Sequence, residues 1–243
     1  MRFASRSGHF KGTNSRKDDM KYDGFTKYDA NVAQNYERDR VGEPHWQAEQ
    51  AFVARFTAEA NLGTVLDLPV GTGRFFEYYG GADSVVGIDI SKHMLAQARD
   101  KASALGATRI DLKEGDALSL PCADSSFDTV VCFRLVHLMP PELVPGVFAE
   151  LARVTRGHIL MQVYASPERA PQGSVRRGLA RLRSLVVPQQ RQQDAKPWSH
   201  IQSYPHTAGF LLGCAEQAGL RLLHRHVIAE YQGVSVDVLD LTK

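Results

Sequence analysis

The residues whose types and spacing could support chemistry gather in the segment VLDLPVGTGRF, residues 65–75. A short apolar, β-branched run ends at Asp67 and leads into a turn that contains Gly71 and Gly73. Glycines in such a turn let backbone N–H groups approach a ligand closely. The dinucleotide fingerprint G-x-G-x-x-G would need a third glycine where this chain has Phe76, so a bound pyrophosphate is disfavoured.

Two more acids follow the next two apolar runs. Asp89 ends the second run, about 22 residues after Asp67, where an acid in a parallel α/β sheet accepts hydrogen bonds from both ribose hydroxyls. Asp116 follows Gly115 after the third run and would suit an exocyclic amine. Asp67, at the end of the first run, would attract a positively charged group such as an ammonium. Three acids around one crevice, one each for an ammonium group, a ribose and an adenine amine, together fit S-adenosylmethionine.

The elements that must position these acids are predicted from the hydrophobic pattern. The runs TVLDL, SVVGIDI, IDLKEGDA, FDTVVCFRLV and HILMQVYA alternate with helical patterns, one of which opens at Ser91 as N-cap. This alternation predicts a parallel sheet with right-handed crossovers and helices on both faces. The segments LRLLHRHVIAEY and VSVDVLDLTK are separated only by Gln232 and Gly233 and predict an antiparallel hairpin. We therefore expect an α/β fold, a doubly wound, mostly parallel, seven-stranded Rossmann-like sheet that ends in this hairpin.

Residues 65–136 resemble the core of the class I S-adenosylmethionine-dependent methyltransferases. In that family the loop reads acid-x-Gly-x-Gly-x-Gly, matched here by Asp67, Gly71 and Gly73, with Pro69 in place of the first glycine. The resemblance implies S-adenosylmethionine as the cofactor and S-adenosylhomocysteine as the product. It also implies a set of cofactor-binding residues: Tyr28, Tyr36, Asp67, Pro69, Gly71, Gly73, Arg74, Asp89, Ile90, Met94, Gly115, Asp116, Ala117 and Arg134.

Proline is acceptable in the loop wherever the backbone has an ordinary φ and donates no hydrogen bond. We expect Pro69 to stiffen the loop without abolishing cofactor binding. Tyr28 and Tyr36 lie on the helical segment before the core, which in similar methyltransferases folds over the cofactor; simple packing of that helix on the core is the alternative.

A hydroxyl acceptor benefits from a general base, and His137, directly after the fourth strand, is the best-placed candidate, with His200 and His206 next. A structural, hydrogen-bonded role is the alternative for a histidine at a strand end. No Asn or Asp precedes a Pro-Pro-aromatic sequence after the fourth strand, which counts against methylation of exocyclic amines on bases. No cluster of metal-ligating acids is present, and we expect no metal in the active site.

The insertion at 166–204 is rich in Pro, Gln and Arg; from 167 to 196 it carries seven basic residues against two acids. Apolar residues at helical spacing within it predict an amphipathic helix whose arginines lie on the other side. Such a helix suits an anionic acceptor, and a solvated helix is the alternative. The acceptor-binding residues expected in this insertion are Arg176, Arg177, Trp198, His200 and Tyr204.

The 243 residues predict one methyltransferase domain, comprising an arm and lid helices at 1–60, a cofactor-binding core at 61–165, the insertion, and a final helix and hairpin at 205–243. The net charge of +2 gives no global argument for nucleic acid or membrane binding. Three cysteines without metal-ligand spacing favour a reducing compartment, and we expect a cytoplasmic protein.

The function expected is O-methylation of a polar or anionic small molecule or glycan, with a membrane surface that presents the acceptor as a peripheral contact. The alternative is an RNA or other nucleic-acid methyltransferase that uses the basic N-terminal arm and the arginine helix. A cofactor-binding protein without turnover is a third reading. The sequence leaves the acceptor atom and the oligomeric state open.

Overall fold

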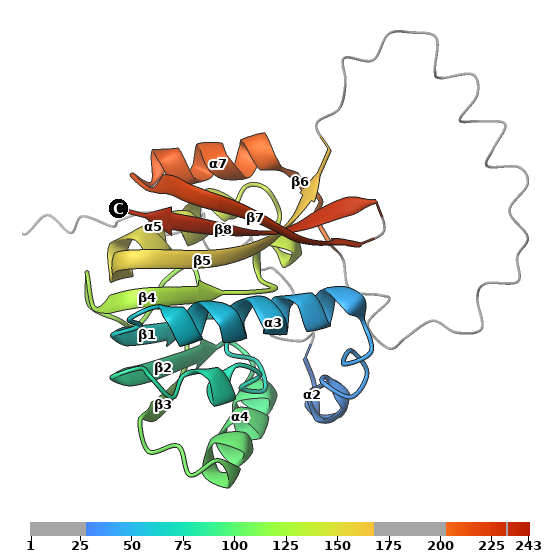
Figure 1. Ribbon diagram of the computed structural model, residues 1–243, viewed down its shortest axis with the longest axis vertical. Helices are drawn as coiled ribbons and strands as arrows, with labels where there is room; N and C mark the ends of the chain where they lie inside the picture. The colour runs from blue at the N-terminus through green and yellow to red at the C-terminus, as the bar shows by residue number, and fades with distance from the viewer. Residues whose placement is uncertain (1–27, 168–202, 232) are drawn as a thin grey trace, which may run out of the picture.

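The computed structural model describes residues 28–167, 203–231 and 233–243. Its sheet has the strand order β3-β2-β1-β4-β5-β8-β7, and a two-residue strand, β6, pairs with β5 (Figure 1). The strands are β1 Thr64–Asp67, β2 Ser84–Asp89, β3 Ile110–Glu114, β4 Phe127–Cys132, β5 Thr155–Ser166, β6 His206–Thr207, β7 Arg221–Tyr231 and β8 Val234–Thr242. All pairs are parallel except β5 with β8 and β8 with β7.

The predicted α/β fold with a C-terminal antiparallel hairpin is confirmed. The sheet has one strand more than the seven expected, because His206 and Thr207 pair with Ala165 and Ser166 at the end of β5. β8 is inserted between β5 and β7, so the hairpin places its second strand inside the sheet and its first at the edge.

The helices are α2 Ala30–Asn35, α3 Pro44–Glu59, α4 Lys92–Ala104, α5 Val144–Val154 and α7 Ala208–Gln217, with short 3-10 turns η1 Phe76–Tyr78 and η2 Val136–Leu138. Local chemistry sets several of their starts: the Ser91 side chain accepts from the Met94 amide, as predicted, and Thr207 accepts from the Phe210 amide. Pro44 occupies the first turn of α3, where its missing N–H costs no hydrogen bond.

Helices cover both faces of the sheet and form two cores. One core joins α5 and α7 to the sheet and includes Phe148 and Leu211, and the other joins α3 and α4 to the opposite face and includes Phe52 and Leu95. Successive strand residues point to opposite faces, so neighbours such as Ile159 and Leu160 of β5 contribute to different cores. In Figure 1, α3 crosses the sheet on the side away from α5 and α7.

Within the described part of the chain, no helix combines the length and the apolar character that a membrane crossing requires. Several sequence-based expectations lie outside the described residues: the basic N-terminal arm, the apolar stripe of the insertion, and the acceptor residues Arg176, Arg177, Trp198 and His200.

Candidate cofactor and acceptor site

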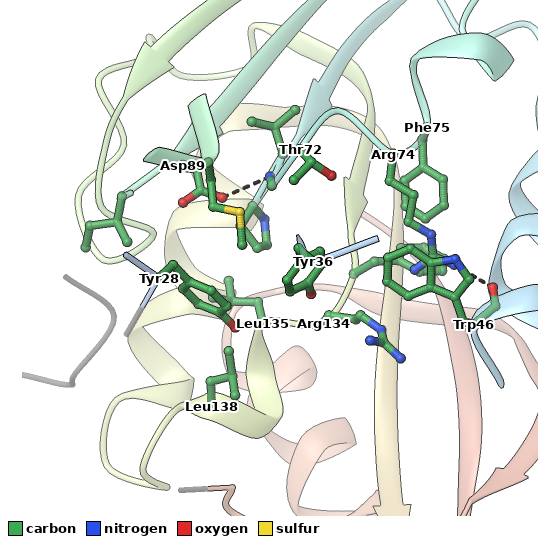
Figure 2. Close-up of a pocket in the computed structure, with 16 residues that line it drawn as sticks. Tyr28, Tyr36, Trp46, Thr72, Arg74, Phe75, Asp89, Arg134, Leu135 and Leu138 are labelled. Atoms are coloured by element: carbon green, nitrogen blue, oxygen red, sulfur yellow. Dashed lines mark hydrogen bonds between the residues drawn. The ribbon is translucent and has the colours of Figure 1, made fainter. Parts of the chain in front are cut away.

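The carboxyl ends of β1, β2 and β4 meet at a pocket that the segment around α2 covers (Figure 2). This is the edge of a doubly wound sheet at which ligands bind. Nine of the fourteen residues expected to contact the cofactor line the pocket: Tyr28, Tyr36, Pro69, Gly71, Arg74, Asp89, Ile90, Met94 and Arg134. Lining residues that were not expected are Trp46, Val70, Thr72, Phe75, Phe133, Leu135 and Leu138.

The glycine loop needs its two glycines for different reasons. Both have positive φ, 57° at Gly71 and 79° at Gly73, in the left-handed region that favours glycine. A Cβ on Gly73 would collide with the Phe76 ring, so Gly73 permits the loop to close on its own 3-10 turn. A Cβ on Gly71 would meet no protein atom within 4 Å, and Gly71 itself lines the pocket.

Pro69 fits into this loop without costing a hydrogen bond. The amide of Leu68 donates to the carbonyl of Val131 at 2.9 Å, and the amide of Val70 donates to the carbonyl of Ile88 at 2.8 Å. The backbone groups on either side of Pro69 are therefore tied to β4 and β2. The Leu68–Pro69 peptide bond is cis. The expectation that Pro69 leaves cofactor binding intact stays a prediction.

Asp89 ends β2 and lies against the loop. Its Oδ2 accepts from the Gly71 amide at 2.9 Å and its Oδ1 accepts from the Ser91 amide at 2.8 Å. Burial raises the pKa of Asp89 to about 6, and the hydrogen bonds from the Ser91, Gly71 and Ile90 amides partly oppose this rise. The loop and the carboxylate thus hold each other in place at the pocket wall.

Five of the expected cofactor residues lie outside the pocket wall: Asp67, Gly73, Gly115, Asp116 and Ala117. Asp67 is buried behind the loop at the end of β1, and burial raises its pKa well above the ordinary value although Tyr79 beside it opposes the rise. Oδ2 of Asp67 accepts no hydrogen bond from the residues that the structure describes. Asp116 turns back on its own chain, where Oδ1 accepts from the Leu118 amide at 3.0 Å. The Gly115 amide donates to the carbonyl of Asp89 at 3.1 Å, which fixes the start of this turn beside β2.

A buried charge cluster that the sequence analysis did not predict forms one wall of the pocket. Glu49 of α3, fully buried, accepts from Nη1 of Arg74 at 2.7 Å and from Nε of Arg134 at 3.0 Å. The Arg74 guanidinium also donates to the carbonyl of Trp46 at 2.6 Å and lies 3.5 Å from the centroid of the Trp46 ring. Figure 2 shows Arg74, Trp46 and Arg134 on the side of the pocket opposite Asp89 and Tyr28.

The two guanidinium groups respond differently to this environment. Burial lowers the pKa of Arg74, and Glu49 only partly opposes that effect. For Arg134 burial also favours the neutral form, but Glu49 and its other partners outweigh it and raise the pKa above the ordinary value. Arg134 further has a φ of 61°, uncommon for a residue other than glycine, and its amide donates to Oε1 of Gln162 at 3.0 Å. The Glu49 carboxylate thus fixes both guanidinium groups at one wall of the pocket.

The sequence does carry a signal for this cluster. The buried positions of α3 are His45, Trp46, Glu49, Phe52 and Val53, a stripe with helical spacing. A glutamate in the middle of such a stripe cannot remain ionised without partners, so it predicts cationic side chains from another element.

The segment that covers the pocket is attached to the core by polar contacts. The Glu37 carboxylate accepts from the Thr72 hydroxyl at 2.6 Å and from Nζ of Lys101 at 2.9 Å, which links the end of α2 to the glycine loop and to α4. The Ser91 hydroxyl donates to the carbonyl of Tyr28 at 2.9 Å. The Tyr28 and Tyr36 rings meet edge to face at 5.9 Å, inside the pocket lining. Tyr28 and Tyr36 therefore lie over the pocket, as a segment that folds over the cofactor would require, and that role stays a prediction.

The expected catalytic histidine lies near the pocket but not in its lining. His137 sits in η2, between the lining residues Leu135 and Leu138, and its ring packs edge to face on Tyr164 at 4.8 Å. The carbonyl of His137 accepts from the amide of Tyr204 at 2.8 Å, so Tyr204 is fixed beside η2. No histidine of the described residues lines the pocket. A base role for His137 and an acceptor role for Tyr204 stay predictions.

His206, the other histidine in this region, is structural. Its Nε2 lies 3.1 Å from the carbonyl oxygens of both Val136 and Met139, which require a donor there. Burial lowers the pKa of His206, with the two carbonyls opposing the shift. This histidine therefore anchors β6 to η2.

Comparison with known proteins agrees with the resemblance seen in the sequence. Residues 65–158, less than half of the chain, match the sequence model of a family described as a methyltransferase domain. This match is consistent with the class I methyltransferases. S-adenosylmethionine is the cofactor of this family.

Relatives of the chain differ in what they are named for. It is 37% identical over 131 residues to a phosphatidylethanolamine N-methyltransferase of Cereibacter sphaeroides, a match that covers 52% of this chain and 63% of the relative. It is 41% identical over 103 residues to a demethylmenaquinone methyltransferase of Shouchella clausii, covering 40% of this chain and 43% of the relative. The matched segments thus span less than two thirds of these relatives.

Among solved structures, magnesium protoporphyrin IX methyltransferase of Synechocystis PCC 6803 with bound S-adenosylhomocysteine matches with a TM-score of 0.63. The two chains are 15% identical, and the match covers 90% of this chain and 97% of the other. This likeness extends the shared fold well beyond the segment that the family model matches.

Proposed function

We propose that this chain is an S-adenosylmethionine-dependent methyltransferase. The observation that carries the proposal is the buried Asp89 carboxylate, which lies at the end of β2 against the Gly71 amide in a pocket of a methyltransferase domain. An acid at this position accepts hydrogen bonds from ribose hydroxyls. Asp89 and the glycine loop would hold the nucleoside part of the cofactor.

Buried polar atoms near the loop fit the other end of the cofactor. Oδ2 of Asp67, which lies behind the loop and outside the pocket lining, has no hydrogen-bond partner among the described residues. The same holds for Nε of Arg74 and Nη2 of Arg134, whose residues line the pocket, although Nη2 of Arg134 lies 3.8 Å from Oε2 of Glu43. A carboxylate oxygen is the acceptor that an ammonium group needs, and guanidinium N–H groups are the donors that a carboxylate needs. The amino-acid end of S-adenosylmethionine carries both groups.

When bound, the cofactor supplies an electrophilic methyl group. The chain's own contribution is to align the acceptor and to exclude water, since the barrier of such a displacement falls chiefly through positioning. Tyr28 and Tyr36 would exclude water by covering the pocket, held by the contacts of Glu37 with Thr72 and Lys101. Leu135 and Leu138 give the side of the pocket next to η2 an apolar wall for the acceptor.

For the acceptor we propose an oxygen of a polar or anionic small molecule or glycan. The chain leaves the sheet at the end of β5 and returns at β6, which pairs with that same end, and Tyr204 is bound to η2 beside the pocket. The intervening segment contains Arg176 and Arg177, which would meet an anionic group. A phosphate-bearing lipid headgroup has the same charge chemistry, and one relative is named for such a lipid.

The test is transfer of label from methyl-labelled S-adenosylmethionine to a fractionated cell extract. We expect label in an aqueous or glycan fraction, retained after nuclease treatment and lost when Asp89 is replaced by Ala. The matched control is Asp100→Asn, on the exposed face of α4, which should leave labelling unchanged.

The distribution of label decides between acceptors. Label in the phospholipid or quinone fraction would keep the enzyme class and replace the acceptor, whereas nuclease-sensitive label would favour the nucleic-acid alternative. Absence of label together with absence of S-adenosylhomocysteine binding in calorimetry would overturn the proposal. The cytoplasmic location expected from the sequence remains part of the proposal.

A further inference from the structure

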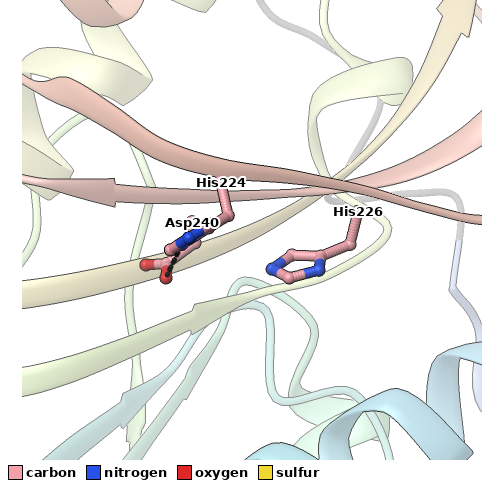
Figure 3. A group of neighbouring side chains, drawn as sticks. All are labelled: His224, His226 and Asp240. Atoms are coloured by element: carbon pink, nitrogen blue, oxygen red, sulfur yellow. Dashed lines mark ion pairs between the residues drawn. The ribbon is translucent and has the colours of Figure 1, made fainter.

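A group of histidines and an acid lies on the C-terminal hairpin, away from the cofactor pocket (Figure 3). His224 and His226 are two residues apart on β7 and therefore point to the same face of the sheet. Asp240 of β8 pairs directly with His224. One ligand atom from each of these three side chains lies within 4.8 Å of the others.

The three side chains of the group differ in burial: Asp240 is buried, His226 is half-buried and His224 is exposed. The Asp240 side chain is 9% exposed and that of His224 is 70% exposed. The His226 ring lies 5.1 Å from the ring of Phe52, so α3 bounds the group on one side. The buried Asp240 carboxylate forms the floor of the group and the exposed His224 imidazole lies at its surface, so a solute can reach the group from solvent.

A third histidine approaches the same carboxylate from the neighbouring strand. Nδ1 of His158, on β5, lies 3.1 Å from Oδ1 of Asp240, and Nδ1 of His224 lies 3.8 Å from Oδ2. A tetrahedral zinc ion with nitrogen and oxygen ligands at about 2.0–2.2 Å keeps those ligand atoms roughly 3.3–3.6 Å apart. The separations of His158 and His224 from Asp240 lie on either side of this spacing, and the ligand atoms of His224, His226 and Asp240 lie within 4.8 Å of one another. Rotation of the exposed His224 side chain can close the remaining gap.

We propose that His224, His226 and Asp240 bind a divalent transition-metal cation of the zinc type, with His158 as the fourth ligand or as the partner that orients Asp240. Imidazole nitrogens with one carboxylate suit Zn²⁺, Co²⁺ and Ni²⁺ and are poor ligands for Mg²⁺ or Ca²⁺. Nothing in this proposal depends on methyl transfer.

The place of the group in the sheet indicates a structural role. His158 is level with Thr129 in β4, whereas the pocket begins past the end of that strand, at Phe133. A metal here would join β7, which pairs only with β8 in the described residues, to β8 and β5. It would therefore stabilise the edge of the sheet.

The experiment is a titration of the full chain, freed of metal by chelation, with Co²⁺ alone, followed by displacement with Zn²⁺. We expect visible absorption bands of tetrahedral Co²⁺ that saturate at one equivalent, and a rise in melting temperature with Zn²⁺. The double variant His224→Asn, His226→Asn should lose the bands and weaken Zn²⁺ binding more than about tenfold. The variant His158→Asn distinguishes a ligand, through altered bands, from an orienting partner.

His93→Asn is the matched control, because His93 is an exposed histidine on α4 far along the chain from the group. It should bind Co²⁺ as the wild type does. Failure of the wild type to give saturable bands, or equal binding by the double variant, would overturn the proposal. S-adenosylhomocysteine binding measured on the same variants should be unchanged, which separates this site from the cofactor pocket and shows that the variants are folded.

Discussion

At the scale of single residues, Asp89 is buried, which favours its protonated form, yet the proposed hydrogen bond from the ribose needs its ionised form. Its pKa is raised to about 6 by burial, and a ribose hydroxyl donates better to an ionised carboxylate. Burial makes Asp89 hold its proton to higher pH in the folded chain than in the unfolded chain, so the stability that the protonated form contributes is present at low pH and is lost as pH rises through about 6.

Cofactor binding should depend on pH in the opposite direction. We expect the affinity for S-adenosylhomocysteine to be constant above pH 6 and to fall towards tenfold per pH unit below it, because Asp89 must first lose its proton. Calorimetry from about pH 5 to about pH 8 measures this, and Asp89→Asn should bind weakly with no such slope. An affinity that is the same across the range in the wild type would contradict the assignment of Asp89.

Glu49 is the counter-ion of two buried guanidinium groups. Glu49→Gln keeps the shape of the side chain but leaves Arg74 and Arg134 without their carboxylate, and such a loss costs about 3–5 kcal/mol in the free energy of unfolding. Urea denaturation would measure it. Glu59→Gln, at an exposed position of the same helix, should change stability by less than about 0.5 kcal/mol. Equal stability of the two variants would mean that the cluster contributes nothing.

At the scale of elements, the segment around α2 that covers the pocket is held in place by the contacts of Glu37. Glu37→Ala removes the acceptor of Thr72 and Lys101, and we expect weaker binding of S-adenosylhomocysteine and faster amide exchange at 28–43. The free energy of unfolding should fall by less than about 1 kcal/mol, because Glu37 is partly exposed. Gln34→Ala, exposed on α2, is the control. Unchanged exchange in Glu37→Ala would show that other contacts hold the lid.

The strands and helix starts could be predicted because their signals are local. The apolar runs that became β1, β2 and β4 and the Ser91 cap are each specified by residues only a few positions apart in the sequence. The Glu49 cluster joins residues 25 and 85 positions apart, and no local pattern specifies which arginines meet. β6 was missed for the same reason, since two residues form a strand only because the end of β5 lies beside them.

At the scale of the whole molecule, the pocket joins the sheet, the loop and the lid, so a bound ligand stabilises all of them. S-adenosylhomocysteine at a hundred times its Kd should add about 2.7 kcal/mol to the free energy of unfolding. For a chain of this size that corresponds to a rise in Tm of about 5–10 °C. Thermal unfolding with and without ligand measures it. Asp89→Ala should abolish the rise; a similar rise in that variant would place the ligand elsewhere.

The position of β8 between β5 and β7 also affects the order of events during synthesis. β7 leaves the ribosome before β8, yet β8 is the strand that connects it to the sheet. At a synthesis rate of about 5–20 residues per second, the segment from the end of β7 to the end of β8 takes about half a second to about two seconds to make, and until then β5 is the open edge of a sheet that is otherwise ready to form. Binding of the nascent chain by a chaperone would therefore be most useful in the short interval between the synthesis of these two strands.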